Sequence, residues 1–438
     1  MERVIFHVDV NSAFLSWTAV DELRKDPTAV DLRTIPSIIG GDQKTRHGIV
    51  TAKSIPAKKY GITTAMPVAE ALRRCPDLVI MPGDFHLYHQ ESMKLMEILH
   101  SYSDIVQQAS VDEAYVDVTE NILAMAASEI SREEMARFAQ SLAATLKDEV
   151  RVSLGFTVNV GISTNKLLAK MASDFTKPDK VHTLFPEEVP RKMWPLPIED
   201  LFGCGPSTAK FLKGKGVHTI GEAAKLDLEL LKGLLGEKSG EYIYAASRGL
   251  GSDEVHTEER EAKSYSNERT VSHDLLSADA KEAEDIIRKL SESVTRRMER
   301  DAVYGRTVTV SVKTSDFRRR SAGLSFDESF RDANKMAETA IDLYHKLTGG
   351  ISGIFSTGVG IRLIGVGAGN LDDGSFRQMN LFEWGKTREQ ELEEEATRRK
   401  QEDLRAEVQL RADKLKSMQD ALDAKFGKGI VKKGINTR

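Results

Sequence analysis

The sequence has little cysteine and no long apolar run. Its two cysteines, Cys75 and Cys204, stand too far apart to indicate a disulfide framework or a thiolate metal cluster, which fits a reducing cytoplasm. No apolar stretch reaches the roughly 20 residues that a helix needs to cross a bilayer. Met1-Glu2-Arg3 leads directly into an apolar segment, so we expect no signal peptide, no membrane partner and a cytoplasmic location.

The sequence also lacks an overall excess of basic residues. The formal net charge is −5, which at first sight argues against binding of nucleic acid. Net charge is a poor guide where charges are segregated, and catalytic carboxylates add to the acidic count. Any surface that binds nucleic acid must therefore be local. With 438 residues, 40% of them hydrophobic, the chain can form several domains with real cores.

What the sequence does contain is a set of acidic residues at the ends of predicted strands. Val4–Val8 is mostly apolar and rich in β-branched residues, so it predicts a buried strand, which Asp9 closes. Asn11 or Ser12 can cap the helix that follows, and free N–H groups at a helix start favour anions such as phosphate. Alone, Asp9 would most simply belong to this helix cap.

Asp112-Glu113 is the second acidic element. Strands are expected on either side of it, at Ile105-Val106 and Ala114–Val118. Adjacent side chains of a regular strand point to opposite faces, so we place the pair at a hairpin tip, where both can converge. With Asp9 they could hold two divalent cations about 3.5–4 Å apart, as phosphoryl transfer requires. Alone, the pair would more simply be a polar turn.

Motifs in a fixed order along the chain, from Arg3 to about Val366, resemble the Y-family, or translesion, DNA polymerases, in particular the bacterial DNA polymerase IV enzymes. They are His7–Phe14, Thr51–Ile62, Ala65–Pro67 with Cys75-Pro76, Ser110–Asp117 and Gly161–Ser173. The resemblance implies that Asp9, Asp112 and Glu113 are catalytic and ligate two Mg²⁺ ions, with Mn²⁺ as an alternative and the backbone of Val10 as a further ligand.

The resemblance also implies residues that bind the incoming nucleotide. Lys166 would reach the triphosphate, and Phe14 would be the steric gate that excludes a 2′-hydroxyl group. Without the motifs, Lys166 would be an ordinary solvated lysine at a helix start. Phe14 would be a core residue of an amphipathic helix.

Four positions depart from the residues that the family usually has: Asn11, Ala52, Ile55 and Lys58. Ile55 and Lys58 stand where a Tyr and an Arg usually grip the triphosphate. Isoleucine cannot donate a hydrogen bond, and lysine is a point charge rather than a bidentate fork. We therefore expect weaker nucleotide binding with the chemistry retained, unless Thr51 or Ser54 compensates.

A local DNA-binding element is expected at Asp200–Lys210, which resembles a helix-hairpin-helix. One short helix would end at Leu201-Phe202, and Ser207 or Thr208 would cap the next, with its free N–H groups directed at a phosphate. Such contacts bind the DNA backbone and carry no sequence information. A plain tight turn is the alternative. The residues predicted to contact DNA here are Gly203, Gly205, Ser207 and Lys210.

A further domain is expected after the charged segment Glu258–Glu261. Helices are predicted at Ser272–Arg300 and Arg331–Leu347, and strands at Arg306–Lys313 and Ser356–Val366. This order resembles the little-finger domain of the family. Its predicted DNA contacts are Arg318, Arg319 and Arg320, for which a solvated loop is the alternative.

Gln378–Phe382 resembles the peptide by which bacterial polymerases dock on the sliding clamp, the DNA polymerase III beta subunit. Leu381 and Phe382 would enter an apolar pocket, and Gln378 would make polar contacts. Lys386–Phe426 is dense in charge, with apolar residues spaced for one helical face, which predicts a solvated helix or a short coiled coil.

The predicted fold is an α+β multidomain right-hand polymerase with palm, small fingers, a helical thumb containing the helix-hairpin-helix, and an α+β little finger. Its expected boundaries are 1–12 and 78–175 for the palm, 13–77 for the fingers, 176–255 for the thumb, 256–370 for the little finger, 371–385 for the linker with the clamp peptide, and 386–438 for the tail.

The predicted activity is template-directed addition of dNTPs to a primer 3′-hydroxyl, with low fidelity, in DNA damage tolerance. The expected partners are primer-template DNA, dNTP and the clamp, with the protein as a monomer. One alternative is a non-catalytic scaffold of the same family that binds DNA and clamp. Another is a nucleotidyl cyclase, against which the hairpin and the clamp peptide argue.

Overall fold

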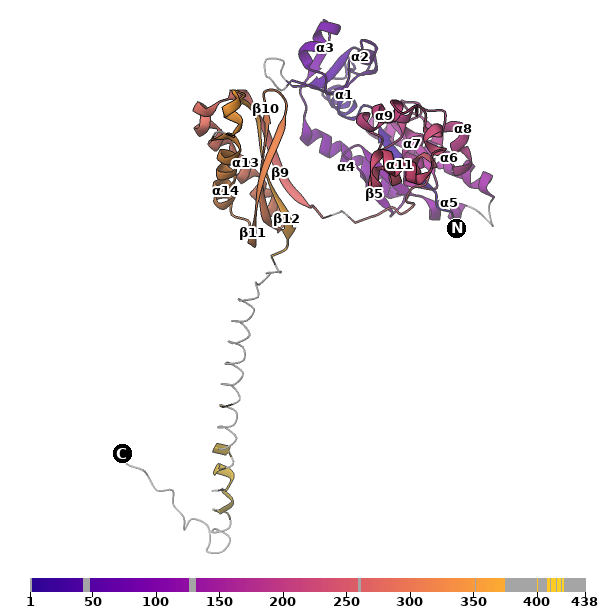
Figure 1. Cartoon of the computed structure of the whole chain (residues 1–438). Coiled ribbons are helices and arrows are strands. Elements are labelled where there is room, and N and C mark those ends of the chain that lie inside the picture. The colour runs from indigo at the N-terminus through magenta and orange to yellow at the C-terminus, as the bar shows by residue number, and fades with distance from the viewer. Residues whose placement is uncertain are drawn as a thin grey trace. The chain divides into compact units, whose positions relative to one another are not determined.

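The computed structural model describes residues 2–41, 48–125, 131–258, 261–350 and 352–374, and in the tail residues 400, 408–409, 411–414, 416–418 and 420. The chain divides into two compact units, Met1–Glu261 and Ala262–Arg438 (Figure 1). Each unit has its own hydrophobic core. Within the described ranges, none of the helices has the length and apolar content of a membrane span.

A five-stranded sheet of order β5-β6-β1-β7-β8 forms the centre of the first unit. Its strands are β1 (Ile5–Val10), β5 (Val106–Gln108), β6 (Glu113–Asp117), β7 (Val158–Ser163) and β8 (Val181–Thr183). All residues of β1 are buried, between β6 and β7. Because side chains alternate, Phe6 and Val8 face the core beneath α4 (Phe85–Tyr102) and α6 (Arg132–Leu154), whereas His7 and Asp9 face α7 (Lys166–Ser173).

A three-stranded sheet of order β3-β2-β4 forms a small lobe of this unit. Its elements are β2 (Ser37–Gly40), β3 (Val50–Lys53), β4 (Val79–Met81), α2 (Ile55–Lys59) and α3 (Val68–Arg74). Helix α1 (Ala13–Lys25) connects this lobe to the central sheet. Its Trp17 belongs to the core of the central sheet, and its Leu15 packs with Ile39 of the small lobe. Phe14 contacts both cores, so α1 places it between the two sheets.

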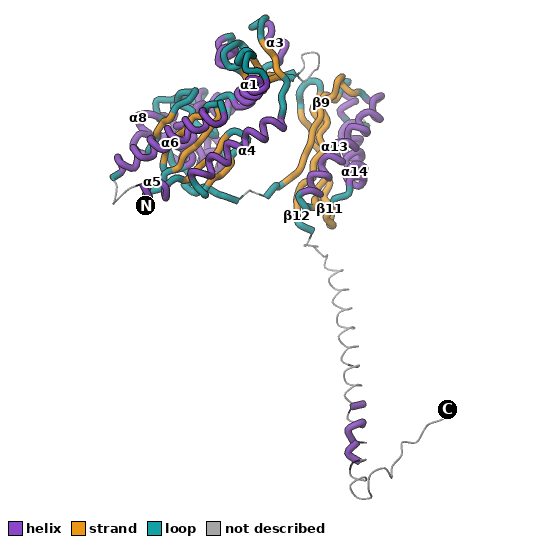
Figure 2. Tube along the Cα trace, turned by 180° about the vertical axis from the view of Figure 1, so that it is seen from behind, coloured by secondary structure: helices purple, strands orange, loops and turns teal. Residues whose placement is uncertain are grey.

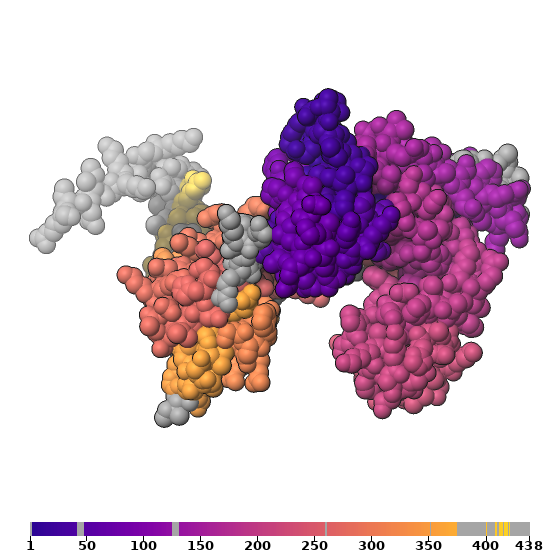
Figure 3. All heavy atoms as spheres, turned by 90° about the horizontal axis from the view of Figure 1, so that it is seen from above, coloured from indigo at the N-terminus to yellow at the C-terminus, as the bar shows by residue number. Residues whose placement is uncertain are grey.

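The rest of the first unit is mainly helical. Its elements are α5 (Thr119–Met125), η1 (Pro186–Glu188), α8 (Val189–Lys192), η2 (Ile198–Asp200), α9 (Pro206–Lys213), α10 (Ile220–Ala224), α11 (Leu228–Leu235) and α12 (Glu237–Ser247). Helices α8 to α12 share a core with one face of α7, and we call them the helical lobe. Figure 3 shows the small lobe in indigo and the helical lobe in pink as separate bodies of the first unit.

The second unit is a four-stranded antiparallel sheet of order β11-β10-β12-β9, covered on one face by two helices (Figure 2). The elements are β9 (Ser264–Leu275), η3 (Ser277–Asp279), α13 (Ala280–Arg300), β10 (Tyr304–Thr314), β11 (Arg319–Phe330), α14 (Ala333–Thr348), η4 (Ile354–Thr357) and β12 (Ile361–Asp372). The buried residues of α13 and α14 repeat every three or four positions, which is the pattern of helices with one apolar face.

For this unit, one expectation was wrong and one strand was missed. Ser272–Arg300 is not one helix, because β9 runs to Leu275 and α13 begins at Ala280. Only three residues of β9, Tyr265, Val271 and Leu275, are fully buried, so its apolar pattern is weak and its pairing with β12 holds it in the sheet. Strand β11 was not predicted either, since Phe330 is its only fully buried residue.

The predicted strand Ser356–Val366 is confirmed from Ile361 onward, where β12 begins, whereas Ser356 and Thr357 belong to the 3₁₀ turn η4. The predicted second helix is confirmed as α14. The clamp peptide Gln378–Phe382 and most of the Lys386–Phe426 segment lie outside the described residues. Both interpretations therefore stay predictions.

Candidate active site

Asp9 and Glu113 lie side by side at one end of the central sheet. Asp9 is on β1, Glu113 is the first residue of β6, and the two are direct partners in the antiparallel register. Asp112 occupies the turn just before β6, and its carbonyl oxygen accepts a hydrogen bond of 3.0 Å from the Val10 N–H. The strands β5 and β6 pair as a hairpin around this turn, as the sequence predicted.

The three carboxylates do not converge as a ready metal cluster. Asp112 Oδ1 accepts a hydrogen bond of 2.7 Å from Ser110 Oγ, and its side chain borders the neighbouring cavity. Within the described part of the chain, no three His, Cys, Asp or Glu side chains are grouped so that they could hold a metal ion.

Two ammonium groups lie against the carboxylates of Asp9 and Glu113. Lys170 of α7 donates to Asp9 Oδ2 at 2.9 Å and to Glu113 Oε1 at 2.7 Å. Lys177 donates to Asp9 Oδ1 at 2.9 Å and also pairs with Asp174. The side chains of Lys170 and Asp9 are each only 8% exposed, so this is a buried ion-pair network. Buried charges of this kind are tolerated only when they are paired.

Burial and pairing shift the pKa values in this network in opposite directions. Burial and the neighbouring Glu113 raise the pKa of Asp9, against the pull of Lys170 and Lys177. The neighbouring His7 ring, followed by the contacts with Asp9 and Lys170, holds the pKa of Glu113 well below its usual range despite burial. Burial opposes the charged form of Lys170, but Asp9 and Glu113 outweigh it and raise its pKa.

His7 lies between Glu113 and Ser173. Its Nε2 lies 3.6 Å from Glu113 Oε2, and its Nδ1 shares a hydrogen bond of 2.8 Å with Ser173 Oγ. The ring is fully buried and packs against Tyr115, with ring centroids 4.8 Å apart. Burial lowers the pKa of His7, which favours the neutral imidazole in the folded protein.

The turn from β1 into α1 differs from the predicted cap. Ser12 occupies the N-cap position with a φ of +50°, but its side chain makes no capping hydrogen bond. The side-chain oxygen of Asn11 instead accepts hydrogen bonds from Thr157 Oγ1 and the Asp179 N–H, both at 2.9 Å. Asn11 therefore connects β1 to the segment that carries Lys177.

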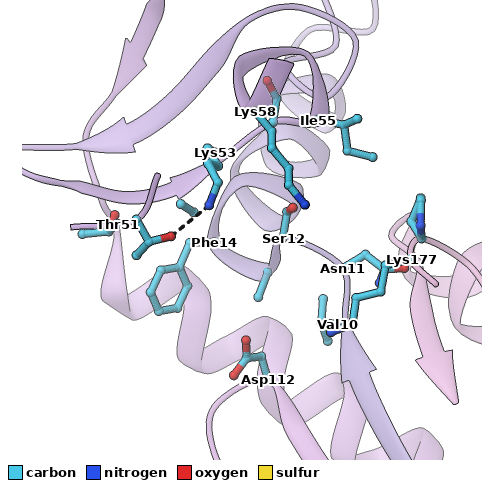
Figure 4. A pocket seen from close by; sticks show the side chains of 15 residues that line it. Val10, Asn11, Ser12, Phe14, Thr51, Lys53, Ile55, Lys58, Asp112 and Lys177 are labelled. Atoms are coloured by element: carbon cyan, nitrogen blue, oxygen red, sulfur yellow. Dashed lines mark hydrogen bonds between the residues drawn. The ribbon is translucent and has the colours of Figure 1, made fainter. Parts of the chain in front are cut away.

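A cavity of about 410 Å³ lies beside the carboxylates (Figure 4). This volume is within the usual range for small-molecule sites. Residues singled out from the sequence that line it are Val10, Asn11, Ser12, Phe14, Thr51, Ala52, Ser54, Ile55, Lys58 and Asp112. Lys53 and Lys177 line it as well, and neither was singled out from the sequence.

Phe14 is held firmly at the cavity wall. Its ring stacks on Tyr88 with centroids 4.5 Å apart and planes at 11°, and it also contacts Trp17 and Phe85. The Tyr88 hydroxyl in turn shares a hydrogen bond of 3.1 Å with Thr18. A ring braced on several sides can exclude a substituent by its volume, because it has little room to move away.

Lys166 does not line this cavity. Its Nζ donates to Gln107 Oε1 at 3.2 Å and lies 5.9 Å from the centre of the Tyr115 ring. Lys177 lines the cavity and Lys166 does not, and the phosphate-binding role expected for Lys166 stays a prediction. The sequence could have indicated Lys170 as a site residue, because it lies in the motif Gly161–Ser173, one helical turn after Lys166. Lys177 lies beyond this motif, so nothing comparable in the sequence indicated it.

The predicted helix-hairpin-helix has a different cap from the one expected. Helix α9 begins after Gly205, so Ser207 and Thr208 lie in its first turn and do not cap it. Gly203 has a φ of +83°, and a Cβ there would come within 2.4 Å of Tyr242. The loop therefore requires glycine at this position. Gly205, Ser207 and Lys210 are exposed.

The predicted basic run of the second unit is partly neutralised. Arg318 pairs with Asp316 at 3.2 Å and is 79% exposed, and Arg319 on β11 pairs with Glu268 on β9. Arg319 and Arg320 begin a strand, so the solvated-loop alternative is wrong for these two residues.

Comparisons with known proteins cover most of the chain. Residues 8–174 match the model of the impB/mucB/samB family, residues 262–381 match its C-terminal domain, and residues 199–251 match the DNA polymerase-iota thumb domain. DNA polymerase IV of Clostridium acetobutylicum is 38% identical over 383 residues, covering 87% of this chain and 91% of the relative. DNA polymerase IV 1 of Bacillus subtilis strain 168 is 31% identical over 439 residues, covering 100% of this chain and 94% of the relative.

Among solved structures, the Y-family DNA polymerase chimera Dbh-Dpo4(243-245)-Dbh has the same fold. The TM-score is 0.70 at 23% identity, over 84% of this chain and 98% of the chimera.

Proposed function

The chain belongs to the impB/mucB/samB family of Y-family DNA polymerases and is a DNA-directed DNA polymerase, and on this premise we propose translesion-type synthesis by two-metal phosphoryl transfer with low fidelity. The predicted family and right-hand α+β fold are confirmed. In the proposed reaction, the primer 3′-hydroxyl attacks the α-phosphorus of a dNTP and releases pyrophosphate. The observation that supports it is an acidic cluster directly beside a lysine-lined cavity.

The donor set of the acidic cluster fits divalent cations. Asp9, Asp112, Glu113 and the Val10 carbonyl would hold them, with two Mg²⁺ ions proposed and Mn²⁺ as the alternative. Two lysine ammonium groups already contact Asp9, so positive charge is stabilised at this position. When bound, the metals would lower the pKa of the primer hydroxyl and stabilise charge on the leaving oxygen.

The side chains around the cavity would bind and select the nucleotide. We assign Lys58 and Lys177 to the triphosphate on the lining of the cavity, and the role suggested for Lys166 stays part of the proposal. Phe14 would exclude the 2′-hydroxyl of ribonucleotides, supported by its braced position. Thr51 and Ile55 would complete the wall beside the phosphates.

Primer-template DNA would be held by the remaining lobes. We propose the palm at 1–12 and 78–175, the fingers at 13–77, the thumb at 176–255 and the little finger at 256–370. The exposed Gly205, Ser207 and Lys210 support a phosphate contact of the thumb, and Arg320 supports one of the little finger. We further propose a monomeric, cytoplasmic protein that acts in damage tolerance.

Primer extension tests this function directly. The parent protein should extend a primer on a DNA template with Mg²⁺ and all four dNTPs, and Asp112→Ala should abolish extension while DNA binding persists. Ser110→Ala, which removes only the hydroxyl that contacts Asp112, is the matched control and should retain most of the activity. If neither parent nor variant extends the primer while both bind DNA, the non-catalytic scaffold becomes the better description.

Docking on the sliding clamp through Gln378–Phe382 is a separate proposal. A double variant, Leu381→Ala with Phe382→Ala, should lose binding to an immobilised DNA polymerase III beta subunit, because these residues would be the apolar anchors. Met379→Ala in the same peptide is the control. Equal binding by the double variant and the parent would show that the peptide is not the docking segment.

A further inference from the structure

One lysine of the cavity has no role in the proposed reaction so far. Lys53 is the last residue of β3, and it lines the cavity together with Lys58 of α2. Figure 4 shows the two side chains reaching into the cavity from the same side, with Lys177 farther along the wall. The cavity wall formed by β3 and α2 is therefore more basic than Lys58 alone would make it.

Within the part of the chain that the structure describes, Lys53 and Lys58 lack counterions of the kind that the carboxylate cluster has. Lys53 Nζ donates to Thr64 Oγ1 at 3.1 Å, which is a neutral acceptor. Among the residues that the structure describes, no carboxylate lies within ion-pair distance of either lysine. Burial lowers the pKa of Lys53, and the positive charge of Lys58 acts in the same direction. An anion bound between them would relieve this repulsion.

The hydroxyl groups that could have replaced the missing tyrosine are already engaged. Thr51 Oγ1 donates to the Ile39 carbonyl at 3.0 Å, and Ser54 Oγ donates to the Ile35 carbonyl at 2.7 Å. Ser54 also accepts the N–H of Ala57, so it serves as the cap of α2. The expected compensation by Thr51 or Ser54 is thus not supported by the structure, and the lysines remain as donors on this wall.

We propose that Lys53 binds the triphosphate of the incoming nucleotide together with Lys58, and so compensates for the isoleucine at position 55. The inference rests on the proposed function, because it takes the cavity to be the nucleotide site. Ammonium groups act as point charges, so two of them favour the most highly charged phosphate chain without fixing its geometry. Nucleotide binding should therefore prefer triphosphate over diphosphate and weaken steeply with salt.

Direct binding measurements test this proposal. Lys53→Met in the full chain should weaken binding of dCTP to the complex with primer-template DNA about tenfold, and the loss should be larger at low salt than at high salt. Lys53→Arg should restore most of the affinity, since it keeps the charge. Lys59→Met, which changes an exposed lysine outside the cavity, is the matched control and should bind dCTP like the parent.

The outcomes separate this proposal from the polymerase function. Equal dCTP binding by Lys53→Met and the parent, with both proteins folded by circular dichroism, would overturn the role of Lys53. Binding of inorganic tripolyphosphate provides the second readout. If Lys53→Met weakens tripolyphosphate binding but the parent extends no primer, the phosphate site stands and the proposed function is wrong.

Discussion

The acidic cluster and the lysine cavity lie next to each other but compensate their charges differently. In the cluster, Lys170 lies within 2.9 Å of Asp9 and 2.7 Å of Glu113, so each charge has an opposite partner. In the cavity, Lys53 and Lys58 repel each other, and the described residues supply no carboxylate to either. The cluster thus contains its own cation, whereas the cavity leaves positive charge for a ligand.

Because of this difference, we expect the cluster to affect the stability of the ligand-free protein and the cavity to affect the binding of an anion. An ion pair that is buried and satisfied stabilises the ligand-free protein, and removing one member leaves an uncompensated charge. Lysines that face solvent and one another add little to stability but raise the affinity for an anion. Substitutions in the cluster should therefore change folding, and substitutions in the cavity should change binding.

The largest effect is expected for Lys170→Met. Removing the ammonium group leaves Asp9 and Glu113 without their main partner, which should lower the free energy of unfolding of the first unit by about 3 kcal/mol in EDTA. Urea denaturation followed by tryptophan fluorescence would measure it. Mg²⁺ should restore part of the loss, because it can take the place of the ammonium group. An unchanged midpoint in EDTA would show that the ion pairs contribute no net stability.

The next effect concerns selection of the sugar at the cavity wall. Phe14→Ala should reduce the preference for dCTP over CTP, measured as the ratio of kcat/KM values, by at least about tenfold, because the ring no longer excludes the 2′-hydroxyl. Phe85→Ala is the matched control, since Phe85 contacts the same cluster but is 70% exposed. Equal discrimination by Phe14→Ala and the parent would contradict the steric gate.

The sequence predicted the hairpin around Asp112-Glu113 because that prediction depends on local features, namely two short apolar strands and a polar turn. It could not predict the pairing of Lys170 with Asp9, which lie 161 positions apart and meet only through packing of α7 on β1. The sequence did not predict the strand β9 for a similar reason. Its ladder with β12 joins Asn267 to Val366, so its stability comes from a distant partner and not from its own apolar pattern.

A smaller effect is expected from His7 as the pH changes. Burial lowers the pKa of His7, so the folded state favours the neutral imidazole, whereas the unfolded state binds a proton below a pH of about 6.5. The parent should therefore lose stability as the pH falls from about 6.5 toward the lowered folded pKa, and His7→Asn should lack this contribution. Urea denaturation midpoints in EDTA at several pH values should show that the difference in stability between the parent and His7→Asn becomes smaller as the pH falls. A constant difference would mean that His7 does not titrate on unfolding.

The smallest effect is expected for Ile55→Tyr, which adds a hydrogen-bond donor to the lysine cavity. Ile55 is 51% exposed at the start of α2, so a tyrosine ring can be accommodated there. One further hydrogen bond to a phosphate should lower the apparent KM for dNTP up to about fivefold. The gain should be larger at high salt, because salt screens the lysine charges more than it weakens a direct hydrogen bond. An unchanged KM at every salt concentration would mean that Lys53 and Lys58 already provide all the binding that this wall can give the triphosphate. The isoleucine at position 55 would then not lower the affinity for dNTP.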